Sequence, residues 1–232
     1  MIARLHIVEF LTKRGNVYLV AKIALWISAF LNSNSKHTVL CIGRSGFNED
    51  ITSMYSHSSR INYLIIPKSI FTSIFNVFFS TVSYRDIHVK YYERDDLKIF
   101  RGEYRKYINR LLDVLFKENK FSAMASGNYV YAWQQEIAAE CLFRGVPFIV
   151  LHKEGMTTKN NYDDLVGTYT NKNFLGSKLL VYNDNIKDAF VNSNIKGLNK
   201  FNVMVSGVPR LDKYFDISQI GKNVVFFSFF LE

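Results

Sequence analysis

Ionisable side chains follow the most apolar strand that the sequence predicts. The stretch Val146–His152 is apolar enough for burial on both faces, and it leads into Lys153, Glu154 and Gly155. Ligands of open parallel sheets bind beyond the carboxyl ends of the strands. Apolar surroundings raise the pKa of a carboxylate and a neighbouring cation lowers it, and either effect can prepare a general base. We therefore predict Glu154 as a catalytic residue, with His152 and Lys153 in a binding role; the alternative is a surface turn that bends at Gly155.

A second loop, Lys13-Arg14-Gly15-Asn16, precedes a long helical pattern and is expected to follow a strand. Glycine allows the backbone to approach a ligand closely, and the N-terminus of the next helix favours an anion. Arg14, Gly15 and Asn16 are therefore candidate binding residues. An ordinary turn, with Asn16 as a helix cap, is the alternative. The loop is not a GxGxxG motif, so it gives dinucleotide binding weak support.

A third loop, Ser126-Gly127-Asn128-Tyr129, opens another helical pattern. Asn128 either caps the helix or donates a hydrogen bond to a sugar hydroxyl. Tyr129 and Tyr131 can stack on the face of a sugar or a base. The cap and the ligand interpretations both stay open.

The fourth loop is Ser206-Gly207-Val208-Pro209-Arg210-Leu211-Asp212. Gly207 and Pro209 favour a tight bend, and Arg210 carries a guanidinium that can bind a phosphate. Asp212 can cap the segment that follows. The alternative is a structural hinge, and both interpretations hold if the bend lies between two domains.

The sequence predicts neither a metal site nor a cofactor. Its five histidines are scattered, and it contains no HExxH, CxxC, GxSxG or Walker motif. The two cysteines, Cys41 and Cys141, lack metal-ligand spacing and fit a reducing cytoplasm.

Strand and helix patterns alternate along the chain, which indicates a doubly wound, Rossmann-like α/β domain with a mostly parallel sheet. The expected strands are Ile2–Val8, His37–Ile42, Ile61–Ile66, Ile87–Tyr92, Phe121–Ser126, Val146–His152, Lys178–Tyr182 and Phe201–Ser206. The expected helices are Leu19–Leu31, Phe71–Val82, Ile108–Phe116, Val130–Leu142 and Asn185–Asn192.

The end of the sequence predicts a domain boundary. Val224–Phe230 is a very apolar strand pattern with no helix after it. A buried parallel strand needs a crossover and a neighbour. We therefore expect one domain over residues 1–215, followed over 216–232 by a linker and the first strand of a second domain. A last edge strand of the first domain is the alternative.

The positive charge lies almost wholly in the first half of the chain. The formal net charge is +9, of which residues 1–120 carry +8. Such an excess suggests nucleic acid, anionic lipid or a phosphorylated substrate as partner, and a basic solvated surface is the alternative. Nucleic acid is disfavoured, because no recognition motif is present and acidic residues are interspersed.

The loops together resemble a known family. The run Phe121-Ser122-Ala123-Met124-Ala125-Ser126-Gly127-Asn128, then Gln134-Gln135-Glu136, then Arg144-Gly145-Val146-Pro147-Phe148-Ile149-Val150-Leu151-His152-Lys153-Glu154-Gly155 is similar to the acceptor-side domain of GT-B glycosyltransferases of bacterial surface and capsular polysaccharide synthesis. The run from Val203 to Asp212 resembles the stretch that such proteins carry before their second domain. CDP-glycerol glycerophosphotransferases have similar stretches.

The resemblance implies two Rossmann-like domains, with the acceptor bound by the first and the nucleotide-linked donor by the second. Glu154 would be the base or charge stabiliser at the transfer centre. Arg14, Gly15, Asn16, Asn128, Tyr129, His152 and Lys153 would bind a glycan or lipid-linked acceptor, and Gly207, Arg210 and Asp212 would lie between the domains or at a phosphate. The donor half is expected outside these residues, so this chain alone should be inactive.

Two other functions stay open: a sugar-nucleotide epimerase-like protein, and a non-catalytic remnant or binding module. The resemblance also implies a cytoplasmic location, peripheral on the inner face of the membrane. The aromatic helix Phe71–Val82 is expected to be core, with membrane contact as the alternative.

Overall fold

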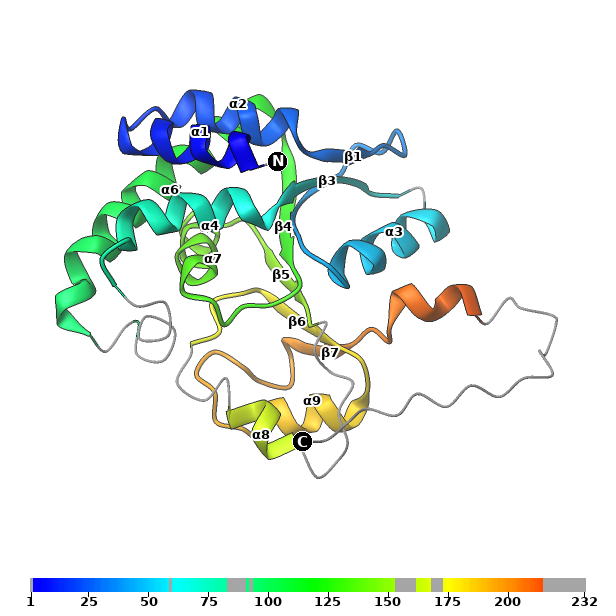
Figure 1. Ribbon diagram of the computed structural model, residues 1–232. Helices are drawn as coiled ribbons and strands as arrows, with labels where there is room; N and C mark the ends of the chain where they lie inside the picture. The colour runs from blue at the N-terminus through cyan, green and yellow to red at the C-terminus, as the bar shows by residue number, and fades with distance from the viewer. Residues whose placement is uncertain are drawn as a thin grey trace.

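The computed structural model describes residues 2–58, 60–82, 91, 94–152, 162–167 and 173–214 (Figure 1). These residues form a sheet with the strand order β1-β3-β2-β4-β5-β6-β7. The strands are β1 (Ala29–Leu31), β2 (Thr38–Gly43), β3 (Asn62–Pro67), β4 (Phe121–Ser126), β5 (Phe148–Leu151), β6 (Lys178–Val181) and β7 (Val203–Val205). All neighbouring pairs are parallel except β1 with β3. The expected doubly wound α/β fold is confirmed.

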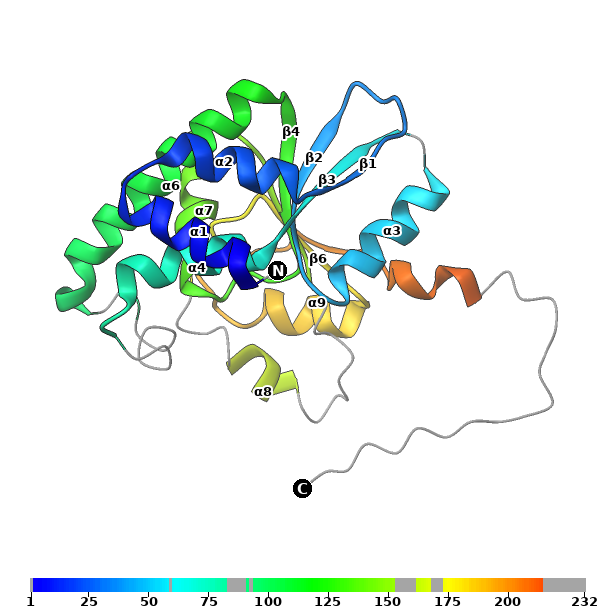
Figure 2. The ribbon, with the colours of Figure 1, turned by 45° about the horizontal axis from the view of Figure 1, so that its top comes forward.

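Helices cover both faces of the sheet (Figure 2). The described α-helices are α1 (Ile2–Lys13), α2 (Val17–Trp26), α3 (Phe47–His57), α4 (Lys68–Phe79), α6 (Lys98–Glu118), α7 (Ala132–Phe143), α8 (Tyr162–Gly167) and α9 (Asp184–Val191), and the 3-10 segments are η1 (Asp95–Leu97) and η3 (Pro209–Tyr214). Side chains alternate along β2: Leu40 and Ile42 join the core cluster with α4 and α6, whereas Cys41 packs with Phe47 and Ile51 of α3.

The direction in which successive strands are added to the sheet changes between β2 and β4. From β2 the chain passes through α3 to β3 on one side, and it later returns to β4 on the other side. β2 and β4 run side by side, with Cys41 opposite Ala125 and Ile42 opposite Ser126. In open α/β sheets such a switch point opens a crevice at the carboxyl ends of the two strands.

The expected strand Ile2–Val8 is wrong, because these residues belong to helix α1. Val8 and Thr12, four residues apart, are both buried, and Leu5 and Leu11 pack against the same core. That spacing is helical, and a short apolar run does not by itself distinguish a helix from a strand. The loop from Lys13 to Asn16 therefore joins two helices and does not follow a strand.

The expected helix Leu19–Leu31 ends earlier than its apolar pattern. α2 ends at Trp26, and the chain then forms β1, antiparallel to β3. The hydroxyl of Ser28 donates to the carbonyl of Leu25 at 2.6 Å, which satisfies a carbonyl in the last turn of the helix. The expected cap is confirmed: Asn16 Oδ1 accepts from the Leu19 amide at 3.1 Å.

Two helices differ from the sequence-based expectation. α3 was not expected at all, and α6 is longer than the predicted Ile108–Phe116 segment. The expected strands Ile87–Tyr92 and Val224–Phe230 lie outside the described residues, apart from Tyr91, which is buried.

The aromatic helix α4 belongs to the core, as the sequence favoured. Phe75 stacks on Phe79 with ring centroids 4.3 Å apart and meets Tyr104 of α6 edge to face at 5.1 Å. Its aromatic stripe is therefore covered, and the alternative of membrane contact through α4 is wrong. None of the helices in the described part of the chain is long and apolar enough to cross a bilayer.

Candidate functional site

Close packing at the β2–β4 switch point depends on two glycines. A Cβ on Gly127 would lie 2.8 Å from Cβ of Phe47, the first residue of α3. A Cβ on Gly43 would lie 2.6 Å from Cγ2 of Ile65. The loop after β4 therefore approaches the start of α3 as closely as a backbone without a side chain permits.

Arg44, which follows β2, links the loops at the ends of the two strands. Its guanidinium lies 5.2 Å from the ring centroid of Tyr131, and Nη2 donates to the Tyr131 hydroxyl at 3.4 Å. The Tyr131 ring is nearly parallel to that of Trp133, at a centroid distance of 6.1 Å. Arg44, Tyr131 and Trp133 therefore form one cationic and aromatic stack beyond the ends of the two strands.

Amide side chains are buried near the ends of β2 and β4. Gln134 Nε2 lies 2.5 Å from Ser126 Oγ at the end of β4. The Oε1 atoms of Gln134 and Gln135, and Oδ1 of Asn48, are buried and have no hydrogen-bond partner among the described residues. A buried carbonyl oxygen without a donor is costly, so these atoms can gain free energy from a hydroxyl or a water molecule.

A pocket of about 490 Å³ lies along α3 and η3, and Asn48 is one of its residues. Its lining consists of hydroxyl, amide and charged side chains: Asn48, Glu49, Thr52, Ser53, Ser56, His57 and Arg210. The Thr52 hydroxyl donates to the Asn48 carbonyl at 2.9 Å, and that of Ser56 donates to the Ser53 carbonyl at 2.7 Å. With their protons directed to the backbone, these oxygens have lone pairs left to accept from a ligand.

Arg210 forms a partly buried ion pair with Asp50 in the wall of this pocket. Its Nη1 atom lies 2.7 Å from Asp50 Oδ2 and 2.7 Å from the Tyr182 hydroxyl, and its amide donates to Asp50 Oδ1 at 3.0 Å. Burial raises the pKa of Asp50 above its usual 3.8, and the hydrogen bonds and charge of Arg210 oppose that effect. The expected phosphate-binding arginine therefore has a structural partner on α3, and both its phosphate role and the hinge stay predictions.

The other residues of that loop are placed as follows. Gly207 has φ +71°, a left-handed conformation that favours glycine, so the expected bend is present. Asp212 lies within η3 and is exposed, and the chain after residue 214 that it was expected to cap lies outside the described residues.

Asn128 acts as a local cap of the loop and not of the helix. Its Oδ1 accepts from the amides of Tyr129 at 2.6 Å and Val130 at 2.9 Å, while α7 begins only at Ala132. Tyr129 is buried, and its ring meets Phe174 edge to face at 5.1 Å. The expected stacking of Tyr129 on a ligand is therefore wrong, because the core occupies its ring.

His152 continues the buried end of β5. Its amide donates to the Leu180 carbonyl at 2.8 Å, and its ring meets Phe190 edge to face at 5.2 Å. The side chain is fully buried, as for a core histidine. Lys153, Glu154 and Gly155 lie outside the described residues, so the catalytic assignment of Glu154 stays a prediction.

The loop from Lys13 to Asn16 lies apart from the sheet edge. Gly15, at φ +66°, turns the chain between α1 and α2, and its carbonyl accepts from Arg110 Nη2 at 3.3 Å. Lys13 and Gly15 border a separate pocket of about 540 Å³ beside α6. The premise that placed Arg14, Gly15 and Asn16 at a strand end is wrong, because α1 is not a strand.

Several residues of the site come from α3, which sequence reasoning missed. Phe47, Ile51 and Tyr55 recur at four-residue spacing, and Glu49 and Asp50 lie in the first helical turn, where carboxylates are favourable. That signal was sufficient to place a helix after β2 and to bring Thr52 to its solvent side. Within the described ranges, no three His, Cys, Asp or Glu side chains gather as metal ligands.

Comparison of the chain with family models, with curated proteins and with solved structures found no match in any of the three.

Proposed function

We propose that this chain is the acceptor-side half of a GT-B-type glycosyltransferase of surface polysaccharide synthesis. It would bind a glycan acceptor while a second domain or partner chain supplies the nucleotide-linked sugar or polyol phosphate. The observation that carries the proposal is the pocket along α3, next to the β2–β4 switch point, which Thr52, Ser53 and Ser56 line with their hydroxyl groups. Carbohydrate hydroxyls are both donors and acceptors, and oxygens such as those of Thr52 and Ser56 complement their donor groups.

The chemistry assigned to the site is acid–base catalysis of group transfer. A carboxylate removes the proton from the acceptor hydroxyl as its oxygen attacks the donor sugar, and the nucleotide leaves with the electron pair of the broken bond. Glu154, which follows the buried strand β5, is the residue assigned to this step, and its assignment rests on the sequence alone. We also propose that an acceptor bound in the pocket along α3 extends to the loop that contains Glu154.

Binding of a panel of bacterial surface oligosaccharides to the 232-residue chain tests the acceptor role. We expect saturable binding that Thr52→Val and Ser56→Ala together weaken at least tenfold, because two acceptor oxygens are lost. Thr72→Val is the matched control, since Thr72 is also a helical threonine whose hydroxyl donates to a backbone carbonyl, that of Ser69. A folded chain that binds none of the glycans, or a control that weakens binding equally, overturns the acceptor assignment.

The catalytic role is tested by Glu154→Gln in a protein that also contains the donor domain. We expect transfer to fall by roughly a thousandfold, while glycan binding stays unchanged. Equal transfer rates for the two forms would remove Glu154 from the mechanism. Turnover of a sugar nucleotide without any acceptor would instead identify an epimerase-like activity.

A further inference from the structure

The pair of helices at the start of the chain has apolar side chains on its solvent side. Phe10 of α1 is 57% exposed, and Tyr18 and Trp26 of α2 are 53% and 69% exposed. Ile7 lies one turn before Phe10, and Leu19 one turn before Lys22 and two turns before Trp26. Each helix therefore carries an outer apolar stripe with helical spacing.

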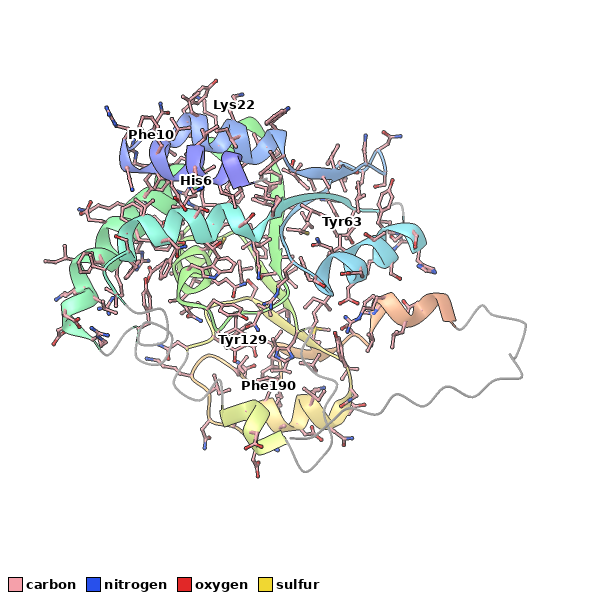
Figure 3. The ribbon with its side chains drawn as sticks, in the orientation of Figure 1. His6, Phe10, Lys22, Tyr63, Tyr129 and Phe190 are labelled. Atoms are coloured by element: carbon pink, nitrogen blue, oxygen red, sulfur yellow. The ribbon has the colours of Figure 1, made fainter. Side chains whose placement is uncertain are left out.

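The opposite sides of these helices form the contacts with the core. Val8, Val17 and Val20 are buried in the main cluster, α1 packs on α4, and α2 packs on α6. Figure 3 shows Phe10 and Lys22 projecting from the pair on the side away from the sheet. The outer stripes therefore take no part in the packing of these helices on the core.

Basic side chains lie among the exposed rings. The guanidinium of Arg14 is 5.3 Å from the ring centroid of Phe10, and Lys22 Nζ is 5.4 Å from that of Tyr18. Lys13 is also exposed, and α2 contains no acidic residue. Together these side chains form one surface, the hairpin surface, which consists of Ile7, Phe10, Lys13, Arg14, Tyr18, Leu19, Lys22 and Trp26.

The neighbouring part of α6 extends the positive charge. Lys106 and Arg110 line the same 540 Å³ pocket as Lys13. Two carboxylates partly compensate this positive charge. Glu103 Oε1 lies 2.8 Å from Lys106 Nζ, and Glu9 Oε2 of α1 lies 3.7 Å from His6 Nδ1. The basic residues still outnumber these carboxylates around the turn between α1 and α2.

Exposed aromatic rings mixed with lysine and arginine are typical of a surface at a membrane interface. A second copy of the chain fits less well, because a two-fold contact would bring like charges together. Anionic headgroups complement the charge, and the acyl boundary can take up the rings. We propose that the hairpin surface docks on an anionic lipid bilayer. This inference does not depend on the proposed transferase function.

The two tryptophans of the chain provide a direct measurement. Trp26 is 69% exposed on the hairpin surface, whereas Trp133 is 2% exposed and serves as a constant background. The fluorescence of the full chain is recorded with vesicles of phosphatidylcholine alone and of phosphatidylcholine with roughly one third phosphatidylglycerol. We expect a shift to shorter wavelength with the anionic vesicles, and loss of that shift in Trp26→Phe.

Sedimentation with the same vesicles separates the apolar and charged contributions. We expect Phe10→Ser with Trp26→Ser to reduce the bound fraction at least tenfold. Changing Lys13, Arg14 and Lys22 to glutamine is expected to weaken binding roughly fivefold for each charge, with an effect that disappears in high salt. Leu142→Ser with Phe143→Ser is the matched control, since both side chains are exposed on α7, outside the hairpin surface.

Three results would overturn the proposal. The first is absence of binding by the unmodified chain to anionic vesicles. The second is an equal loss of binding in the α7 control. The third is a dimer in light scattering that Phe10→Ser with Trp26→Ser converts to a monomer, because that result assigns the surface to a second copy.

Discussion

At the scale of single residues, Arg210 joins parts of the chain that are far apart in sequence. Its side chain lies between the buried Asp50 of α3 and Tyr182 after β6, while Ser53 donates to the carbonyl of Pro209 at 2.5 Å. The segment after β7 is therefore fixed to the face of the sheet that α3 covers.

Replacing Arg210 is expected to destabilise the fold. Arg210→Ala leaves the fully buried carboxylate of Asp50 without its cation, so the free energy of unfolding should fall by about 3 kcal/mol. Urea denaturation measures this loss. Arg60→Ala, at an exposed arginine, should change it by less than about 0.5 kcal/mol. Equal effects of the two substitutions would show that the ion pair contributes nothing specific.

The two cysteines are expected to be chemically inert in the folded protein. Burial raises the pKa of Cys141 to about 12 and raises that of Cys41 as well. With a pKa of about 12, roughly one Cys141 thiol in ten thousand is ionised at pH 8. Iodoacetamide followed by mass spectrometry should label neither thiol in the native chain and both in denaturant. Rapid labelling without denaturant would contradict this burial.

The sequence indicated which residues could have a functional role better than it indicated which residues they contact. Arg210 was a candidate because of its loop, and it does line the pocket of α3. Its partner Asp50 is 160 positions away, and no local pattern encodes such a pairing. Tyr129 was misjudged for the same reason, since the burial of its ring depends on Phe174.

At the scale of elements, strands with apolar runs and the helix α9 were predictable, whereas the helices α1 and α3 were not. β2, β3 and β4 follow the expected segments closely, because buried parallel strands have near-continuous apolar sequences. α1 was assigned as a strand because its first residues have no decisive period. The position of the Lys13–Asn16 loop was wrong as a consequence.

The approach of α3 to the loop after β4 can be tested with a pair of glycines. Gly127→Ala places a methyl group 2.8 Å from Phe47 Cβ and is expected to cost about 2 kcal/mol of stability. Gly102→Ala lies in α6 with open space around it, so it should stabilise by roughly 1 kcal/mol through helix propensity. Thermal unfolding of both variants provides the measurement. A neutral Gly127→Ala would show that the switch point is looser than the structure indicates.

At the scale of the whole molecule, the topology determines where the candidate site lies. The sequence predicted parallel strands and helices in alternation, but strand order depends on pairings between distant segments, such as β2 with β4. Only that order identifies the switch point, and only the switch point singles out α3 and its pocket among the sheet-edge loops.

The domain boundary expected near residue 215 makes a truncation informative. A chain that ends at residue 215 keeps β7 and η3, so its unfolding midpoint should stay within about 2 °C of the full chain. A chain that ends at residue 202 loses Val203 from the core and Arg210 from Asp50, and it should unfold far earlier. Calorimetry compares the three chains. A large decrease in the unfolding midpoint of the 215-residue chain would show that the first domain extends beyond residue 215.

The strand order has a consequence for how the chain can assemble during synthesis. β1, β2 and β3 all lie within residues 29–67 and pair among themselves. β4 adds to β2, and each later strand adds to the one made before it. From β3 onward the sheet can therefore grow in step with translation, because each new strand leaving the ribosome finds a partner that has already been made.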